Sequence, residues 1–164
     1  DYETASTAIQ AAMTGHLVLS TLHTNDAPSS MTRLINIGIE PFLVASAVNA
    51  VLAQRLARKV CSKCVEMKKP SSQEKELLKG YACKKIPHAV GCSSCRGSGY
   101  AGRVGLYELL IMDDELRDAI AGNPSITAFR NLAIERGMAN LQADGFAKVA
   151  QGLTTIDEIY RLTH

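Results

Sequence analysis

The chain has 164 residues, of which 46% are hydrophobic and 5% aromatic, and its formal net charge is +2. This length supports one ordinary hydrophobic core with room for a small second lobe. The longest apolar stretch, 42–53, is interrupted by Ser46 and Asn49, so it falls short of the roughly 18 residues that a membrane span needs, and no signal peptide is visible. Because the sequence opens at Asp1 without an initiator methionine, we expect it to be part of a longer protein.

The charge is distributed unevenly along the chain. Residues 58–103 include eleven basic and three acidic residues, a local net charge of +8, whereas the remaining residues carry −6. Such asymmetry is typical of separate surfaces or lobes. All five cysteines lie in the basic segment, and without an export signal their paired spacing indicates a metal site before disulfides.

The first elements follow the pattern of an α/β domain. Residues 3–14 predict an amphipathic helix that ends at a glycine, and the short apolar run Leu17–Leu22 predicts a strand buried on both faces, as in parallel sheets covered by helices. Asp26 is typical of a helix N-cap, and the helix that it begins is expected to end at Gly38.

The next segment, Phe42–Leu56, is apolar nearly all round, which predicts a helix buried beneath the sheet. On this hypothesis a charged side chain at Ala50 would prevent folding or destabilise the fold strongly. A second strand is expected over Leu56–Cys61. Because the single strand Leu17–Leu22 cannot make a sheet, the missing strands are expected to precede Asp1.

The remainder predicts one short helix, one strand and four further helices. The short helix is expected over Gln73–Lys79 and the strand over Gly102–Met112. Asp113 and Ser125 are typical N-caps for the first two of the four helices. The last helix opens with Thr155–Glu158, which matches a capping box in which Thr and Glu each satisfy a free backbone N–H.

Two Cys-x-x-Cys pairs, with 27 residues between them, give the strongest chemical signal: Cys61, Cys64, Cys92 and Cys95. Two such pairs supply the four thiolates that zinc binds in a tetrahedron. A structural zinc site is favoured over free buried thiols or a lost metal. Catalytic zinc is disfavoured because four cysteines leave no open position for water. The fifth cysteine, Cys83, is interpreted as a small core hydrophobe.

Basic residues flank both cysteine pairs, and we expect them to offset the charge of −2 that Zn²⁺ and four thiolates carry together. These residues are Arg58, Lys59, Lys63 and Arg96. Gly97 and Gly99 follow the second pair and suit a tight turn around a metal.

The run Gly97–Gly102 matches G-x-G-x-x-G, but it follows a cysteine pair and precedes a predicted strand, whereas a dinucleotide fingerprint needs a strand before it and a helix after it. The same run also has the spacing of a phosphate-binding loop. Arg103 and Val104 stand where such a loop needs Lys and Ser or Thr. No phosphate-binding loop is therefore predicted in this chain.

Polar side chains follow the predicted strand Leu17–Leu22 at its carboxyl end, where open parallel sheets bind their ligands. Two histidines, His16 and His23, flank the strand, and an imidazole or hydroxyl there can contact an anion or place a water. The alternative is that His23 stabilises a turn and Asp26 only caps the next helix. Two further histidines are interpreted as surface residues: His88 and His164.

Several stretches resemble the signature of the secretion ATPases that drive type II secretion and type IV pilus assembly. Asp1–Ala5 resembles the tail of the family's Walker B segment, and Gly15–Asn25 resembles its histidine box residue for residue. Ala53–Leu56, Gly99–Leu109 and the closing Gly152–Ile159 are similar to further parts of the signature. With the two cysteine pairs, the resemblance extends over nearly the whole chain.

This resemblance implies an α/β fold in three parts. Residues 1–57 would form the C-terminal part of a RecA-like ATPase domain, a P-loop NTPase fold. Residues 58–102 would form the tetracysteine zinc-binding lobe, and residues 103–164 a strand followed by a helical C-terminal region.

The resemblance also implies an activity. The parent protein would be a homo-hexamer that binds and hydrolyses ATP with Mg²⁺, sits in the cytoplasm at the inner-membrane face, and works with inner-membrane platform proteins but not with nucleic acid. His16 and His23 would be catalytic residues at the nucleotide site, with His23 facing the γ-phosphate, and Thr24 would be a nucleotide-binding residue. Because the phosphate-loop lysine and the Walker B glutamate would precede Asp1, the chain alone is expected to be inactive.

Two alternatives remain at this point. The +8 segment around a zinc ribbon is compatible with a nucleic-acid-binding module, although Tyr81 and Tyr100 are too few aromatic residues for a base-stacking platform. The second alternative is a docking domain that binds the secretion platform. Within the resemblance, the cysteine pairs favour pilus-extension motors and type II secretion ATPases over retraction motors.

Overall fold

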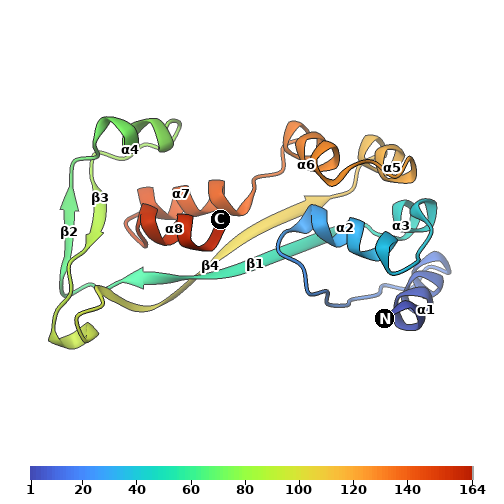
Figure 1. Cartoon of the computed structure of the whole chain (residues 1–164), viewed down its shortest axis with the longest axis horizontal. Helices are drawn as coiled ribbons and strands as arrows, with labels where there is room; N and C mark the ends of the chain where they lie inside the picture. The colour runs from blue at the N-terminus through green and yellow to red at the C-terminus, as the bar shows by residue number, and fades with distance from the viewer. Residues whose placement is uncertain (164) are drawn as a thin grey trace. The chain divides into compact units, whose positions relative to one another are not determined.

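The computed structural model describes residues 1–163, which form two compact units (Figure 1). Unit 1 consists of Asp1–Ala53 and Glu108–Ala139, and unit 2 consists of Gln54–Tyr107 and the described residues from Asn140 onward. The elements are α1 (Tyr2–Met13), α2 (Ala27–Asn36), α3 (Pro41–Ala47), β1 (Ala50–Val60), β2 (Val65–Lys68), α4 (Ser72–Leu77), β3 (Ile86–Ala89), the 3-10 turn η1 (Ser93–Cys95), β4 (Tyr100–Ile111), α5 (Asp114–Ala121), α6 (Ile126–Glu135), α7 (Leu141–Ala150) and α8 (Ile156–Thr163).

Unit 1 is mainly helical and is held together by one apolar core. In this unit α3 packs against α5, and α2 packs against α6. Each large side chain that is fully buried contributes about 1.5–3 kcal/mol relative to an exposed one. The largest side chains in this core are Met31, Val44, Leu110, Leu116, Ile120 and Phe129.

Unit 2 contains the antiparallel hairpin of β2 and β3, in which Val65 pairs with Ala89 and Lys68 with Ile86. Helices α7 and α8 pack against each other and contribute to the core of unit 2. That core is built from side chains of strands and helices alike, namely Ala57, Ile86, Leu106, Phe146, Val149 and Ile159.

Strands β1 and β4 form a second two-stranded sheet, and their arrows run in opposite directions in Figure 1. Along β4, buried and exposed residues alternate from Leu106 to Ile111, as expected for a sheet with one covered face. This confirms the strand predicted over Gly102–Met112. The strand predicted over Leu56–Cys61 is the second half of a longer one.

The helix predicted over Phe42–Leu56 is wrong in its second half. Helix α3 ends at Ala47 because the Arg117 guanidinium donates hydrogen bonds to the carbonyl oxygens of Ala45 and Val48, the latter at 3.1 Å. Val48 already has an extended backbone (φ −84°, ψ 123°). The chain then continues as β1 paired with β4. Ala50 lies exposed on this strand, so the predicted burial at this position is also wrong.

The buried strand predicted over Leu17–Leu22 is not formed either. This run has no regular secondary structure and belongs to neither sheet, and 87% of Leu17 and of Leu19 is exposed. An extended segment is counted as a strand only when a neighbour supplies the backbone hydrogen bonds. Among residues 1–163, no strand lies beside this run to do so.

Most helix caps follow the sequence prediction. The side chains of Asp26, Asp113 and Ser125 each accept a hydrogen bond from a backbone N–H in the first turn of α2, α5 and α6. The capping box at α8 is only half as predicted. Thr155 Oγ1 accepts from the Glu158 N–H at 3.3 Å, but the Glu158 carboxylate binds the arginines described below.

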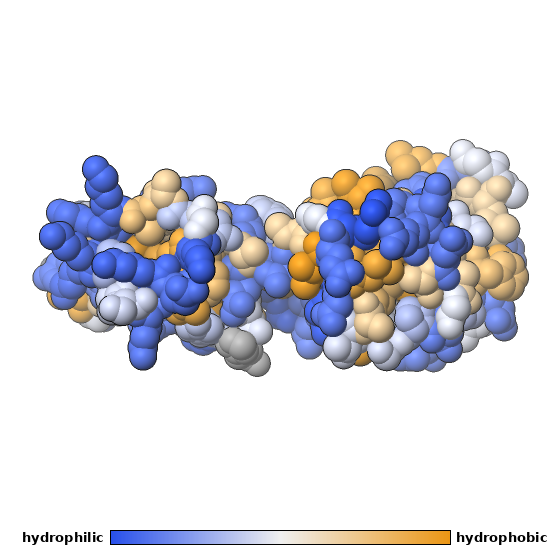
Figure 2. All heavy atoms as spheres, turned by 90° about the horizontal axis from the view of Figure 1, so that it is seen from above, coloured by the Kyte–Doolittle hydropathy of each residue, from blue (hydrophilic) through white to orange (hydrophobic). Residues whose placement is uncertain are grey.

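Within residues 1–163, no helix is both long and apolar enough to cross a membrane. Figure 2 shows hydrophobic atoms on the viewed face at the right, among the residues of unit 1, mixed with hydrophilic ones. The three-part division at residues 57 and 102 stays a prediction, since it concerns domains of a longer parent.

Candidate functional site

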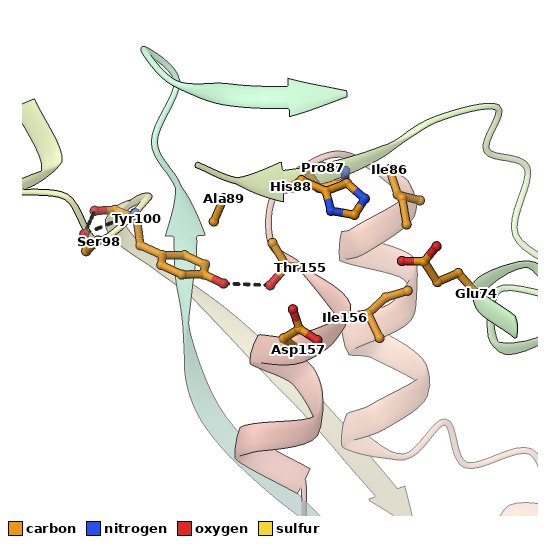
Figure 3. A pocket seen from close by; sticks show the side chains of 10 residues that line it. All are labelled: Glu74, Ile86, Pro87, His88, Ala89, Ser98, Tyr100, Thr155, Ile156 and Asp157. Atoms are coloured by element: carbon orange, nitrogen blue, oxygen red, sulfur yellow. Dashed lines mark hydrogen bonds between the residues drawn. The ribbon is translucent and has the colours of Figure 1, made fainter. Parts of the chain in front are cut away.

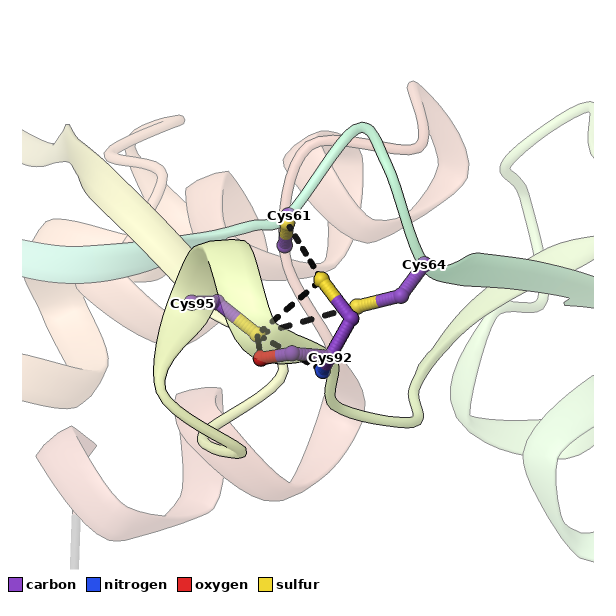
Figure 4. A group of neighbouring side chains, drawn as sticks. All are labelled: Cys61, Cys64, Cys92 and Cys95. Atoms are coloured by element: carbon purple, nitrogen blue, oxygen red, sulfur yellow. Dashed lines mark hydrogen bonds between the residues drawn. The ribbon is translucent and has the colours of Figure 1, made fainter.

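The four paired cysteines come together in unit 2 (Figure 4). Cys61 follows β1 and Cys64 precedes β2, and the turn between them is closed by the Cys64 and Val65 N–H groups, which both donate to the Cys61 carbonyl. Cys92 directly precedes the turn η1, and Cys95 is its last residue. The four sulfur atoms lie within 4.8 Å of one another.

The distances between the sulfurs fit a tetrahedral metal site. Three Sγ pairs are separated by 3.8 to 4.0 Å: Cys61 with Cys92, Cys64 with Cys95, and Cys92 with Cys95. A Zn–S bond of about 2.3 Å gives a tetrahedron with S–S edges of about 3.8 Å. A disulfide would need about 2.05 Å, and all five cysteines are free. The donor set and its spacing therefore fit a four-coordinate zinc ion.

Backbone N–H groups already point at one of the sulfurs. Cys92 N–H and Gly99 N–H donate to Cys95 Sγ at 3.1 and 3.2 Å. The bond from Cys92, with that from Gly99, lowers the pKa of the Cys95 thiol to about 6, whereas burial raises the pKa of Cys64 to about 12. A metal that binds all four must displace their protons, so binding is expected to strengthen as pH rises.

Glycines allow the second cysteine loop to close tightly. A Cβ atom on Gly91 would lie 2.5 Å from the Gly97 carbonyl oxygen, and one on Gly99 would lie 2.7 Å from the Ala89 Cβ. Gly97 and Gly99 also adopt φ of +76° and +77°, which L side chains rarely do. The loop that presents Cys92 and Cys95 therefore requires these small residues.

Two basic residues near the cysteines form specific contacts, in addition to any role in offsetting the charge of the site. Lys63 Nζ donates to Ser94 Oγ at 3.2 Å, which links the two cysteine loops. Arg58 is bound by Glu158 and lies over the Tyr100 ring. Cys83 is half-buried and packs against the unit 2 core, in agreement with its interpretation as a small hydrophobe.

The predicted nucleotide-site residues lie in unit 1, on the exposed run that joins α1 to α2. His16 Nδ1 lies 3.1 Å from Thr14 Oγ1 and 3.3 Å from the Ala11 carbonyl oxygen, so this ring stabilises the end of α1. The His23 side chain is exposed. Thr24 Oγ1 lies 2.7 Å from Ser30 Oγ in α2.

The N-terminus of α2, directly after this run, is held by two residues that sequence reasoning missed. Arg130 of α6 donates to Asp26 Oδ2 at 2.8 Å, and Glu108 of β4 accepts the Ala27 N–H at 2.7 Å although it is only 3% exposed. Burial raises the pKa of Asp26, but hydrogen bonds from Ser29 and Arg130 outweigh it and leave the pKa lowered. Arg130 and Glu108 lie 104 and 81 residues along the chain from their partners, and no local sequence pattern indicates contacts over such separations.

A cavity of about 280 Å³ lies in unit 2 beside the hairpin of β2 and β3 (Figure 3). His88 lines it with the carboxylates of Glu74 and Asp157, and the Tyr100 hydroxyl lies 2.8 Å from Thr155 Oγ1 at its edge. His88 is thus half-buried rather than a surface residue as predicted. His164 lies outside the described residues.

Known proteins resemble this chain over almost its full length. It is 44% identical to the type IV pilus assembly ATPase PilB of Thermus thermophilus, covering 99% of this chain and 19% of that protein. It is also 44% identical to the type II secretion system ATPase E of Vibrio cholerae, covering 99% and 33% respectively. The chain therefore spans about a fifth to a third of the length of these relatives.

Solved structures show the same fold at lower sequence identity. The pilus retraction motor PilT with bound ADP superposes with a TM-score of 0.65 at 23% identity, over 99% of this chain and 36% of PilT. The ATPase DotB of Yersinia pseudotuberculosis gives a TM-score of 0.67 at 17% identity, over 99% and 34%. This likeness confirms the predicted α/β fold, which the chain shares with these two ATPases. Since the family named Type II/IV secretion system protein matches residues 1–161, the chain belongs to that family.

Proposed function

We propose that this chain is the C-terminal part of a RecA-like motor that hydrolyses ATP to drive type IV pilus assembly or type II protein secretion. The observation that carries the proposal is the family match over residues 1–161, together with 44% identity to proteins named as ATPases of both systems. Since the chain spans a fifth to a third of these proteins, the activity belongs to the parent protein.

The histidine box is the part of this chain that we assign to the nucleotide site. In the parent, His23 contacts the γ-phosphate of ATP, His16 supports the same run, and Thr24 contributes to nucleotide binding. Two observations support this: the run is exposed, and its far end is fixed where Glu108 and Arg130 hold the start of α2. The backbone cradle, lysine and Mg²⁺ that bind a triphosphate most strongly come from elsewhere in the parent.

The exposed apolar side chains of this run are consistent with a strand that is buried in the complete ATPase domain of the parent. Leu17 and Leu19 are large, unpaired with any strand in residues 1–163, and costly to leave in water. The rest of the parent's sheet covers them. This run is therefore the part of the chain that the complete domain would bury.

We assign Zn²⁺ to the four cysteines as a structural ion. The sulfur spacing and the N–H groups that point at Cys95 support this assignment. The four thiolates would hold the ion, and its free energy of binding would stabilise a lobe that has few large apolar residues. Four sulfur ligands leave no position for a water nucleophile, so the ion takes no part in hydrolysis.

The assembly follows from the same proposal. The parent forms a homo-hexamer at the cytoplasmic face of the inner membrane and transmits its motion to platform proteins embedded there. Nucleic acid is not a partner.

The test compares ATP hydrolysis by two purified samples, the 164-residue chain and the full-length parent that contains it. The proposal expects turnover that tracks protein concentration in the parent only. Turnover by the chain alone would refute the assignment of the triphosphate cradle to the rest of the parent. Absence of ATP hydrolysis in a hexameric, folded parent would refute the motor function.

A further inference from the structure

A short segment, Leu153–Glu158, runs from the loop after α7 into the first turn of α8, and it contacts both strands that adjoin the cysteine cluster. Strand β1 leads into Cys61, and strand β4 begins five residues after Cys95. The segment, the cysteines and the strand ends that the segment contacts all belong to unit 2. The contacts are specific hydrogen bonds rather than general packing, and they form one connected set.

The first strand is held at Arg58 and Val60, directly before Cys61. Thr154 Oγ1 donates to the Arg58 carbonyl at 2.9 Å, and the Val60 N–H donates to the Leu153 carbonyl at 3.0 Å. Glu158 accepts three hydrogen bonds from Arg58, one from the backbone N–H at 2.9 Å and two from the guanidinium at 2.7 and 2.9 Å. Both the backbone and the side chain of Arg58 are therefore fixed.

The second strand is held at Tyr100. Its hydroxyl lies 2.8 Å from Thr155 Oγ1 (Figure 3), and its ring lies 4.2 Å below the Arg58 guanidinium. The preceding residue, Gly99, accepts the Cys61 N–H at 2.9 Å and donates to Cys95 Sγ at 3.2 Å. The contacts thus extend from α8 through two strands to both cysteine loops.

Three polar side chains of this segment are almost completely buried. Thr154, Thr155 and Glu158 are 0%, 5% and 1% exposed. Arg161 also binds the Glu158 carboxylate, at 2.7 and 2.8 Å. A buried carboxylate is costly to remove from water, and losing one partner of such a group is strongly destabilising, so this arrangement holds its neighbours in one geometry.

We propose that Leu153–Glu158 is a clasp that positions the tetracysteine site, with Glu158 as its principal positioning residue. The clasp holds the two strand ends at the separation that places Cys61 and Cys95 around one ion, so docking of α8 controls how tightly the metal is retained. The inference rests on the proposal that the four cysteines bind zinc. It goes beyond that proposal because none of the clasp residues is a metal ligand.

The test uses the 164-residue chain loaded with zinc and measures the rate at which a chromogenic chelator removes the metal, well below the unfolding temperature. Three variants are compared with wild type. Glu158→Gln keeps the shape but loses the charge that binds two arginines. Tyr100→Phe keeps the ring under Arg58 and loses only the hydroxyl. Glu66→Gln is the matched control, since Glu66 lies two residues from Cys64 and its carboxylate forms an ion pair with the exposed Lys68.

Metal release is expected to accelerate by on the order of tenfold or more in Glu158→Gln, and by less in Tyr100→Phe, because residues that orient metal ligands typically change affinity about 10–100-fold. The Glu66→Gln control is expected to release zinc at the wild-type rate. With Co²⁺ in place of zinc, the ligand-field bands are expected to shift in Glu158→Gln and to stay unchanged in the control. A role in general stability alone would lower the unfolding temperature without changing these bands.

Wild-type release rates and wild-type Co²⁺ bands in folded Glu158→Gln would overturn the clasp. If that variant does not fold, unchanged release in Tyr100→Phe would overturn it equally. Zinc content is measured first in every sample. A wild-type chain that holds no zinc would refute the metal assignment itself, whereas zinc-loaded variants with unchanged release would refute the clasp alone.

Discussion

Helices α7 and α8 meet at a glycine, and a single methyl group there should destabilise unit 2. Gly145 lies in the interior of α7, and a Cβ atom added to it would stand 2.7 Å from Ile159 Cδ1 and 2.8 Å from Cγ2. Contacts below 3.0 Å must be relieved by movement. Ile159 is fully buried in the unit 2 core.

Two opposing effects decide the sign of Gly145→Ala. Alanine is favoured over glycine in a helix interior by about 0.5–1 kcal/mol. Overpacking a filled core costs about 1–3 kcal/mol. Because the clash involves two atoms of a fully buried, β-branched side chain, the second effect should win, and we expect unit 2 to lose about 1–2 kcal/mol of stability.

The assay is urea denaturation of the zinc-loaded chain followed by circular dichroism, with Gly122→Ala as the matched control. A Cβ on Gly122, at the end of α5, would lie 3.4 Å from the Ala119 carbonyl oxygen and 3.8 Å from that of Asp118, which are tolerable contacts, and the φ of −77° suits alanine. We expect the control to be neutral or slightly stabilising. Adding Ile159→Val to Gly145→Ala removes Cδ1, so the double variant should be more stable than the sum of the single changes predicts. A Gly145→Ala chain as stable as wild type would refute the tight contact between α7 and α8.

Two further predictions concern the metal and the buried carboxylate. Chelation of the metal should unfold residues 61–99 and spare unit 1, because zinc binding supplies folding free energy to the lobe. Amide hydrogen exchange, measured segment by segment, tests this. Protection of residues 61–99 that survives complete metal removal would contradict it. Burial raises the pKa of Glu158, but hydrogen bonds from Arg161 and Arg58 outweigh it and lower the pKa from 4.5 to about 2. The stability that this carboxylate contributes, about 3 kcal/mol at 1.36 kcal/mol per pH unit, is present above pH 4.5 and is lost as pH falls toward 2. The difference in urea midpoint between wild type and Glu158→Gln should therefore shrink below pH 4.5, and a difference that is constant from pH 7 to pH 2.5 would show that the ion pair does not form.

The local signals in the sequence were the reliable ones. The cysteine spacing placed Cys61, Cys64, Cys92 and Cys95 as one cluster because the chemistry of four thiolates allows few arrangements. Asp26, like the other N-caps, could be predicted since a cap involves residues only three apart. For the same reason the half of the Thr155 capping box that depends on Thr155 itself was correct.

The wrong predictions depended on partners far along the chain. Small apolar residues in 42–56 are compatible with a helix, but β4 and Arg117 decide where α3 ends and β1 begins. The Glu158 carboxylate was expected to bind a backbone N–H at the start of its own helix, but it binds Arg58, which lies 100 residues earlier in the chain. The run Leu17–Leu22 has the composition of a buried strand, but no strand within residues 1–163 pairs with it. Periodicity does not report such long-range pairing.

The most direct test of the proposed motor function is ATP turnover by the full-length parent carrying His23→Ala. If His23 contacts the γ-phosphate as it leaves, turnover should fall by about 10²–10³-fold, equivalent to about 2.7–4 kcal/mol, while ATP binding changes much less. His88→Ala is the control, because His88 lies in unit 2 beside the cavity and should leave turnover unchanged. Turnover of His23→Ala at the wild-type rate would contradict the account and return His23 to the role of a turn residue.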